Sequence, residues 1–403
     1  MISLPTQTNL ADLELFIQKV RQSPGQDLRV PVQVNRGGSF GFPAVAVQAV
    51  ATWARLHEGI RRLRVTPTFI EDENTRNRLA GSLLGMTGLY FAHEVISGEK
   101  VIPRAVALES VAPRVFAMED YRYRDTLRGR NVALCCFEGA KLEFVKSLYA
   151  MPRRGNAAES WVRPAAEFKT ILENMLEACA SGSSRNLSEL QLEVLAQLVH
   201  QLFKNADVHA TSDVQGSLYD AGVRGLQVRE VVIGDEKAFS DFVAGDRAFE
   251  SYLTKLNRRA LFREKDEHGK KAHLGEWKSS SFIEVTVFDT GPGLALRWLA
   301  NQSGVTQYSQ VGRETELRAI NECFHLHATT HSAAMRGDGL PIALRAMAQL
   351  QAFMFLRTGR LALFQDFSSG EHVGFSPRAR YGSQRTLGEA AGASYSICFP
   401  MPR

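Results

Sequence analysis

The chain has 403 residues, of which 44% are hydrophobic and 23% charged, a balance that excludes a chain disordered throughout. Its net charge of +5 is too small to indicate nucleic-acid binding by itself. The most apolar stretch, residues 42–54, is too short to span a bilayer, and five scattered cysteines without zinc-type spacing exclude a disulfide scaffold and a zinc finger. We expect a cytoplasmic protein of two to three domains with reduced cysteines, no membrane segment and no secretory signal.

Residues 1–150 alternate between strand and helix patterns, which predicts an N-terminal α/β domain. The strand patterns lie at 28–34, 60–68 and 131–139, and the helical patterns at 44–56 and 73–96. We expect these strands to form a small sheet in a domain that senses a signal or binds a partner. Residues 151–163 contain basic and small residues and show no helical or strand periodicity. This segment therefore predicts a connection to a second domain at 164–403.

The second domain begins with two helical patterns. The first covers 164–180, and the second runs from a capping box at Ser188 and Gln191 to about His209. Further strand patterns lie at 228–233, 282–288, in a hairpin at 352–367 and at 395–400, with helical patterns at 294–327 and from 340. The charged insertion at 234–278 predicts a solvated loop in its basic part, with a surface for nucleic acid or an acidic partner as the alternative.

Polar residues recur every four positions along the second of these helices. They are Gln197, Gln201, Asn205 and His209, and this spacing puts them on one face. Such a face is ordinarily solvated, but Asn205 is followed by a small alanine in an otherwise well-packed helix. An amide oxygen there can complete the coordination of a Mg²⁺ that also holds phosphate oxygens.

The strand at 282–288 ends at Asp289 and runs into a turn that contains Gly291 and Gly293. A carboxylate at a strand end can accept a hydrogen bond from an exocyclic amine, and glycines let a flat ring approach the backbone closely. An ordinary turn after a strand is the alternative.

A second pair of glycines, Gly337 and Gly339, precedes a helix with Leu340 and Pro341 in its first turn. The free backbone N–H groups and the dipole of such a helix start suit a phosphate group. A simple helix start is the alternative.

These three segments, in this order, resemble the ATP-binding domain of the GHKL superfamily, which includes DNA gyrase, the Hsp-ninety chaperones, histidine kinases and MutL-type ATPases. The run FKNA at 203–206 and the closing run at 392–400 are most similar to the histidine-kinase and mitochondrial dehydrogenase-kinase branch. The resemblance covers residues 160–403 and implies a two-layer α/β sandwich of the Bergerat type that binds ATP and Mg²⁺ under a mobile lid.

The resemblance also implies a role for each matching residue. Asn205 would hold Mg²⁺, Asp289 would bind the adenine amine, and Gly291 and Gly293 would shape the base pocket. Gly337, Gly339 and the amide of Leu340 would face the phosphates, and residues 327–336 would form the lid.

Two positions depart from the family pattern. Gln201 stands where hydrolysing members have the glutamate that acts as general base, and an amide cannot accept the proton. Ala393 stands where a threonine often binds the base, with Ser394 one place further on. We therefore predict an ATP-operated switch with slow or no hydrolysis that acts on a protein partner or a second copy of itself. The alternative is an active ATPase or a protein kinase.

Overall fold

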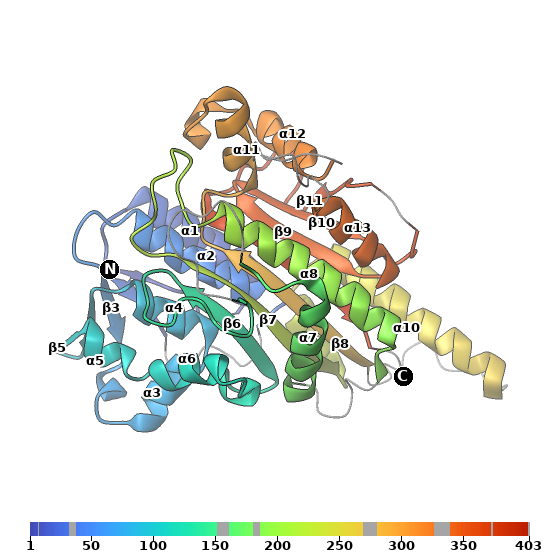
Figure 1. Ribbon diagram of the computed structural model, residues 1–403, viewed down its shortest axis with the longest axis horizontal. Helices are drawn as coiled ribbons and strands as arrows, with labels where there is room; N and C mark the ends of the chain where they lie inside the picture. The colour runs from blue at the N-terminus through green and yellow to red at the C-terminus, as the bar shows by residue number, and fades with distance from the viewer. Residues whose placement is uncertain are drawn as a thin grey trace.

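The computed structural model describes residues 1–6, 8–31, 38–150, 161–179, 186–268, 280–325, 339–371 and 374–401. It is a mixed α/β structure, as predicted, with a five-stranded and a seven-stranded sheet (Figure 1). In these ranges no helix combines the length and the apolar character needed to cross a bilayer.

The five-stranded sheet is built from N-terminal residues. Its first four strands run parallel and the fifth closes the edge antiparallel, in the order β1 (Ile2–Ser3), β2 (Leu28–Arg29), β3 (Arg62–Val65), β4 (Glu94–Ser97) and β5 (Lys100–Pro103). The helices of this part are α1 (Leu10–Gln22), α2 (Phe42–Arg55), α3 (Glu73–Ala80), α4 (Leu83–Phe91), α5 (Arg104–Leu108) and α6 (Ala112–Glu119).

Two N-terminal predictions need correction. The strand predicted at 28–34 is confirmed only as β2, and residues 32–34 lie outside the described ranges. The continuous helix predicted at 73–96 is wrong, because Gly81 ends α3 and Ser82 caps α4 by accepting a hydrogen bond from the Gly85 amide at 3.0 Å. The rest of that segment is β4.

The seven-stranded sheet combines residues from both predicted domains. Its spatial order is β11 (Arg378–Ala379), β10 (Leu361–Asp366), β9 (Phe353–Gly359), β12 (Ala390–Pro400), β8 (Ser280–Asp289), β7 (Val223–Ile233) and β6 (Asn131–Phe137), with antiparallel neighbours. The predicted strand at 131–139 exists, but it pairs with β7 rather than with the N-terminal strands. Residues 132–137 of this strand are buried on both of its faces, so the strand must lie in a sheet that is covered on both sides. The larger sheet meets this requirement. The predicted boundary at residue 150 therefore does not separate the two sheets.

Helices cover both faces of the larger sheet. On one face, α8 (Glu189–His209) crosses the strands, with α7 (Ala165–Cys179) and α13 (Gly339–Gln349) beside it (Figure 1). Arg224 and Asp289 are cross-strand partners and share this face, since Asp207 of α8 binds Arg224. On the opposite face, Gln48 of α2 binds Ser394 of β12.

Helix α2 joins the two parts of the molecule. Every residue from Phe42 to Ala54 except Pro43 is buried, as expected for a helix that is apolar all round. It packs against α1 and α4 on one side and against β12 and β8 on the other. The N-terminal part therefore shares a continuous core with the larger sheet.

The predicted loop in the charged insertion is instead helical as far as residue 268. It holds α9 (Glu236–Val243) and α10 (Arg247–His268), because Asp235 caps α9 and Phe249, Tyr252, Leu253 and Leu256 form a buried helical stripe. Residues 269–279 lie outside the described ranges. The predicted helical region at 294–327 comprises α11 (Leu294–Ser303) and α12 (Arg313–Cys323).

Candidate functional site

Helix α8 provides the polar face predicted from the sequence. Its start is confirmed as a capping box, in which the Gln191 amide donates to Ser188 Oγ at 3.2 Å and the Ser188 amide donates to Gln191 Oε1 at 3.0 Å. Gln197 is exposed, whereas Gln201 and Asn205 are half-buried. Among the described residues, the side-chain amides of Gln201 and Asn205 make no hydrogen bond.

Asp289 lies at the end of β8 and is only 6% exposed. Its Oδ1 accepts hydrogen bonds from the Gly291 amide at 2.8 Å and from the Ala393 amide at 3.2 Å. Within the described part of the chain, Oδ2 accepts none. Burial raises the pKa of Asp289 to about 6, while these two amides and the cations Arg55 and Arg297 act in the opposite direction.

The glycines of the turn after β8 have packing reasons that the sequence did not reveal. A Cβ on Gly291 would lie 2.6 Å from Ala210 Cα, at the end of α8. Gly293 has a φ of +85°, and a Cβ there would lie 2.9 Å from Thr358 Oγ1 and from the Tyr308 hydroxyl. Both glycines thus let the turn pack closely between α8 and β9, whatever they contribute to a base pocket.

The start of α13 lies against the polar face of α8. Gln201 Oε1 is 3.0 Å from the point where a Cβ on Gly339 would lie, and Leu340 is buried. The structure therefore brings Gly339 and Gln201 together, as the prediction requires. Gly337 and the predicted lid at 327–336 lie outside the described residues.

Ser394 does not occupy the predicted position. Its hydroxyl donates to Gln48 Oε1 at 3.0 Å on the α2 face of the sheet. Side chains alternate along a strand, so Ala393 shares the face of Asp289 and Ser394 cannot. The assignment of Ser394 to the base pocket is therefore wrong, and β12 contributes the Ala393 amide instead.

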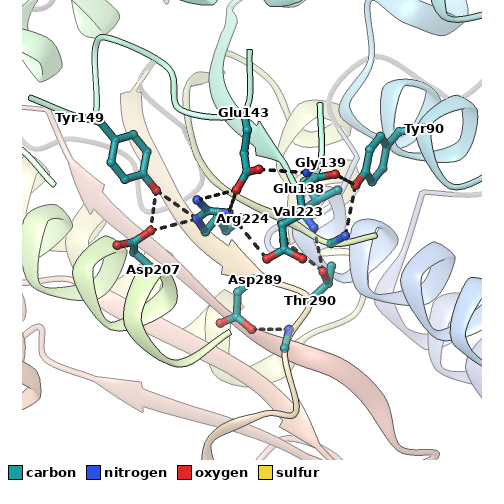
Figure 2. Close-up of polar contacts among 12 residues, drawn as sticks. Tyr90, Glu138, Gly139, Glu143, Tyr149, Asp207, Val223, Arg224, Asp289 and Thr290 are labelled. Atoms are coloured by element: carbon teal, nitrogen blue, oxygen red, sulfur yellow. Dashed lines mark hydrogen bonds and ion pairs between the residues drawn. The ribbon is translucent and has the colours of Figure 1, made fainter. Parts of the chain in front are cut away.

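A buried charge cluster beside the site was not predicted. Arg224 of β7, whose side chain is 1% exposed, lies 3.1 Å from Asp207 Oδ1 and 3.4 Å from Glu143 Oε1, and it donates to the Tyr149 hydroxyl at 3.0 Å (Figure 2). Glu138 lies 3.7 Å away, and burial raises its pKa to about 7 against the opposing charge of Arg224. Arg224 is one of four polar residues in β7, with Gln227, Arg229 and Glu230, so the sequence of that strand did not single it out.

Arg55 is a second residue that the sequence did not indicate. It is the last residue of α2, and it donates hydrogen bonds to the carbonyl oxygens of Thr290 and Gly291. The N-terminal part of the chain thus contacts the turn that follows Asp289.

Comparison with models of protein families, with curated proteins and with solved structures finds no match to this chain. Any assignment of function therefore depends on the geometry described above and on the resemblance of its motifs.

Proposed function

We propose that this chain binds ATP together with Mg²⁺ between α8, the end of β8 and the start of α13. The observation that supports this proposal best is the hydrogen bonding of the Asp289 carboxylate. Two backbone amides hold Oδ1 in place and leave Oδ2 without a donor among the described residues. A carboxylate oriented in this way is an acceptor prepared for an exocyclic amine such as that of adenine.

The polar face of α8 suits the metal and phosphate end of the nucleotide. Asn205 would supply an oxygen ligand to Mg²⁺, a hard cation that binds few protein groups and several phosphate oxygens. Gly339, beside Gln201, begins a helix of eleven residues whose first N–H groups would face the phosphates. The bound Mg²⁺ would neutralise phosphate charge.

The same face supports a switch rather than a fast ATPase. Gln201 occupies the position of the usual general base and cannot accept a proton from water. Its neighbour His200 is no substitute, because its ring packs edge-on against Phe168 of α7 with centroids 5.3 Å apart. Burial lowers the pKa of His200 to about 4, so it is neutral at pH 7, but it lies away from the ligand-facing side of α8.

The proposal includes the finer fold assignment. Helices α7, α8 and α13 over β9, β12, β8 and β7 would form the two-layer GHKL sandwich, and α2 would add cover to its second face. A nucleotide-dependent lid at 327–336 would then alter the surface offered to a protein partner or to a second copy. Among the described residues, no observation favours the sequence-based alternative, an ATPase or protein kinase, over this switch.

Calorimetry of ATP and ADP binding, with and without Mg²⁺, tests the proposal. Asp289→Asn keeps the side-chain volume but presents an amide to the adenine amine, and we expect ATP affinity to fall by about 1–3 kcal/mol. Asp366→Asn is the matched control, since Asp366 also ends a strand of this sheet but pairs with Lys255. Unchanged affinity in folded Asp289→Asn, or no ATP binding by the wild type, would contradict the proposal.

A further inference from the structure

The guanidinium of Arg55 donates hydrogen bonds to the backbone of the turn after β8. Nη1 donates to the Gly291 carbonyl oxygen at 2.7 Å, and Nη2 donates to the Thr290 carbonyl oxygen. The guanidinium also lies over the Tyr219 ring, with Cζ 3.8 Å from the ring centroid. Arg55 therefore connects the end of α2 to the peptide group between Thr290 and Gly291.

That peptide group is the one that orients Asp289. The Thr290 carbonyl and the Gly291 N–H belong to a single planar peptide, so fixing the direction of one fixes the direction of the other. Arg55 holds the carbonyl, and the N–H donates to Asp289 Oδ1 at 2.8 Å. Hydrogen bonds linked in series polarise one another, so the bond from Arg55 strengthens the bond from the Gly291 N–H to the carboxylate of Asp289.

Simple packing does not account for Arg55. Burial is the largest influence on this side chain and lowers its pKa, and no carboxylate among the described residues lies within ion-pair distance of it. Arg55 is half-buried, and desolvating a guanidinium without an ion pair costs free energy that an apolar side chain of similar volume covering the same surface would not cost. Unlike an apolar side chain, the guanidinium donates two hydrogen bonds to the carbonyl oxygens of the turn.

Helix α2 is firmly attached to the sheet that carries this turn. Gln48 Nε2 donates to the carbonyl oxygens of Arg357 at 3.1 Å and Ala391 at 3.0 Å, and Thr52 Oγ1 accepts from the Ala391 amide at 2.9 Å. The same stretch of β12 supplies the Ala393 amide to Asp289 Oδ1. A displacement of α2 would thus disturb both hydrogen bonds to that carboxylate.

We infer that Arg55 is a positioning residue for Asp289, through which the N-terminal part of the chain sets the affinity of the nucleotide site. This inference rests on the proposed function and adds a regulatory contact to it. In this inference Arg55 acts on the carboxylate of Asp289 through the 290–291 peptide. The state of α2, and of the N-terminal part packed on it, would then control how strongly ATP binds.

The test compares Arg55→Met and Arg55→Lys with Arg62→Met. Methionine keeps the volume and removes the donors, and lysine keeps the charge but cannot hold two carbonyls at once. Arg62 is the control because it pairs with Glu94 across β3 and β4 of the five-stranded sheet. Amide hydrogen exchange of residues 289–296 is measured without nucleotide, and ATP affinity is measured by calorimetry. We expect faster exchange and ATP affinity weaker on the order of tenfold in Arg55→Met, smaller effects in Arg55→Lys, and none in Arg62→Met.

Arg55→Met is also combined with Asp289→Asn. If Arg55 acts through Asp289, its removal costs little further affinity in the Asp289→Asn background, whereas a merely structural role gives additive losses. Additive losses, or unchanged exchange and affinity in a folded variant, would overturn the inference, and if Arg55→Met does not fold the lysine variant decides. A wild type that binds no ATP overturns the proposed function, and the exchange data then still show whether Arg55 orders the turn.

Discussion

Restoring a carboxylate at position 201 is the most informative perturbation of this site. Gln201→Glu changes an amide to a carboxylate of nearly the same volume on the ligand-facing side of α8. Gln201 Oε1 lies 3.0 Å from the Cβ position of Gly339, at the first turn of α13. A negative charge near a helix N-terminus is favourable by about 0.3–1 kcal/mol, so we expect the variant to fold and to keep ATP affinity within a few-fold.

The expected gain in rate follows from the chemistry of the missing base. General-base assistance contributes roughly 10²–10⁴-fold, which would be realised in full only if the attacking water is well placed. We therefore expect at least about a tenfold rise in phosphate release, equivalent to ~1.4 kcal/mol of activation free energy. The wild type should release phosphate very slowly.

Steady-state phosphate release at saturating Mg·ATP, with affinity measured in parallel, gives the answer. Gln197→Glu is the matched control, because it adds the same charge one turn earlier on an exposed part of the same face. Wild-type turnover on the order of 1 s⁻¹ would show that another residue supplies the base, and the enzyme alternative would be correct. No gain in Gln201→Glu at normal affinity would mean that the water is not positioned, and the chain would then be a nucleotide-binding module.

Three further predictions follow from the same geometry. Asn205→Ala should weaken binding of Mg·ATP far more than binding of metal-free ATP, and equal losses in calorimetry would make Asn205 a packing residue. The pKa of Asp289 is raised to about 6, so the carboxylate is protonated as the pH falls through that value. ATP affinity should then drop by about tenfold between pH 8 and pH 5 relative to Asp289→Asn, and parallel pH profiles would refute it. Arg224→Met removes the buried guanidinium that pairs with Asp207 and should lower the free energy of unfolding by about 3–5 kcal/mol in denaturant titrations, whereas Lys100→Met, which breaks an ion pair with Glu71 whose two side chains are 65% and 74% exposed, should cost less than about 1 kcal/mol.

Local elements of the candidate site could be predicted because their signals are short in range. The capping box at Ser188 places the start of α8, and its four-residue spacing puts Gln201 and Asn205 on one face. The strand that ends at Asp289 and the helix that starts at Gly339 were predicted in the same way. Each of these depends on a few neighbouring residues.

Positions that depend on contacts between distant segments of the chain could not be predicted from the sequence. A shift of one residue along a strand moves a side chain to the other face, so the register of β12 with β8 decided that Ser394 faces α2. The pairing of β6 with β7 joins segments that are about 90 residues apart in the chain, and no local pattern specifies such a partner.

The sequence by itself therefore determined elements such as α8, β8 and α13 and the polar groups at their ends, because helix periodicity, strand alternation and capping are local properties. Tertiary structure alone decided that α2 packs between the helices α1 and α4 and the larger sheet, and that its last residue, Arg55, reaches the peptide that orients Asp289. The physical reason is that an apolar helix such as α2 specifies only that it must be buried. The surfaces that bury it are set by the packing of the whole chain.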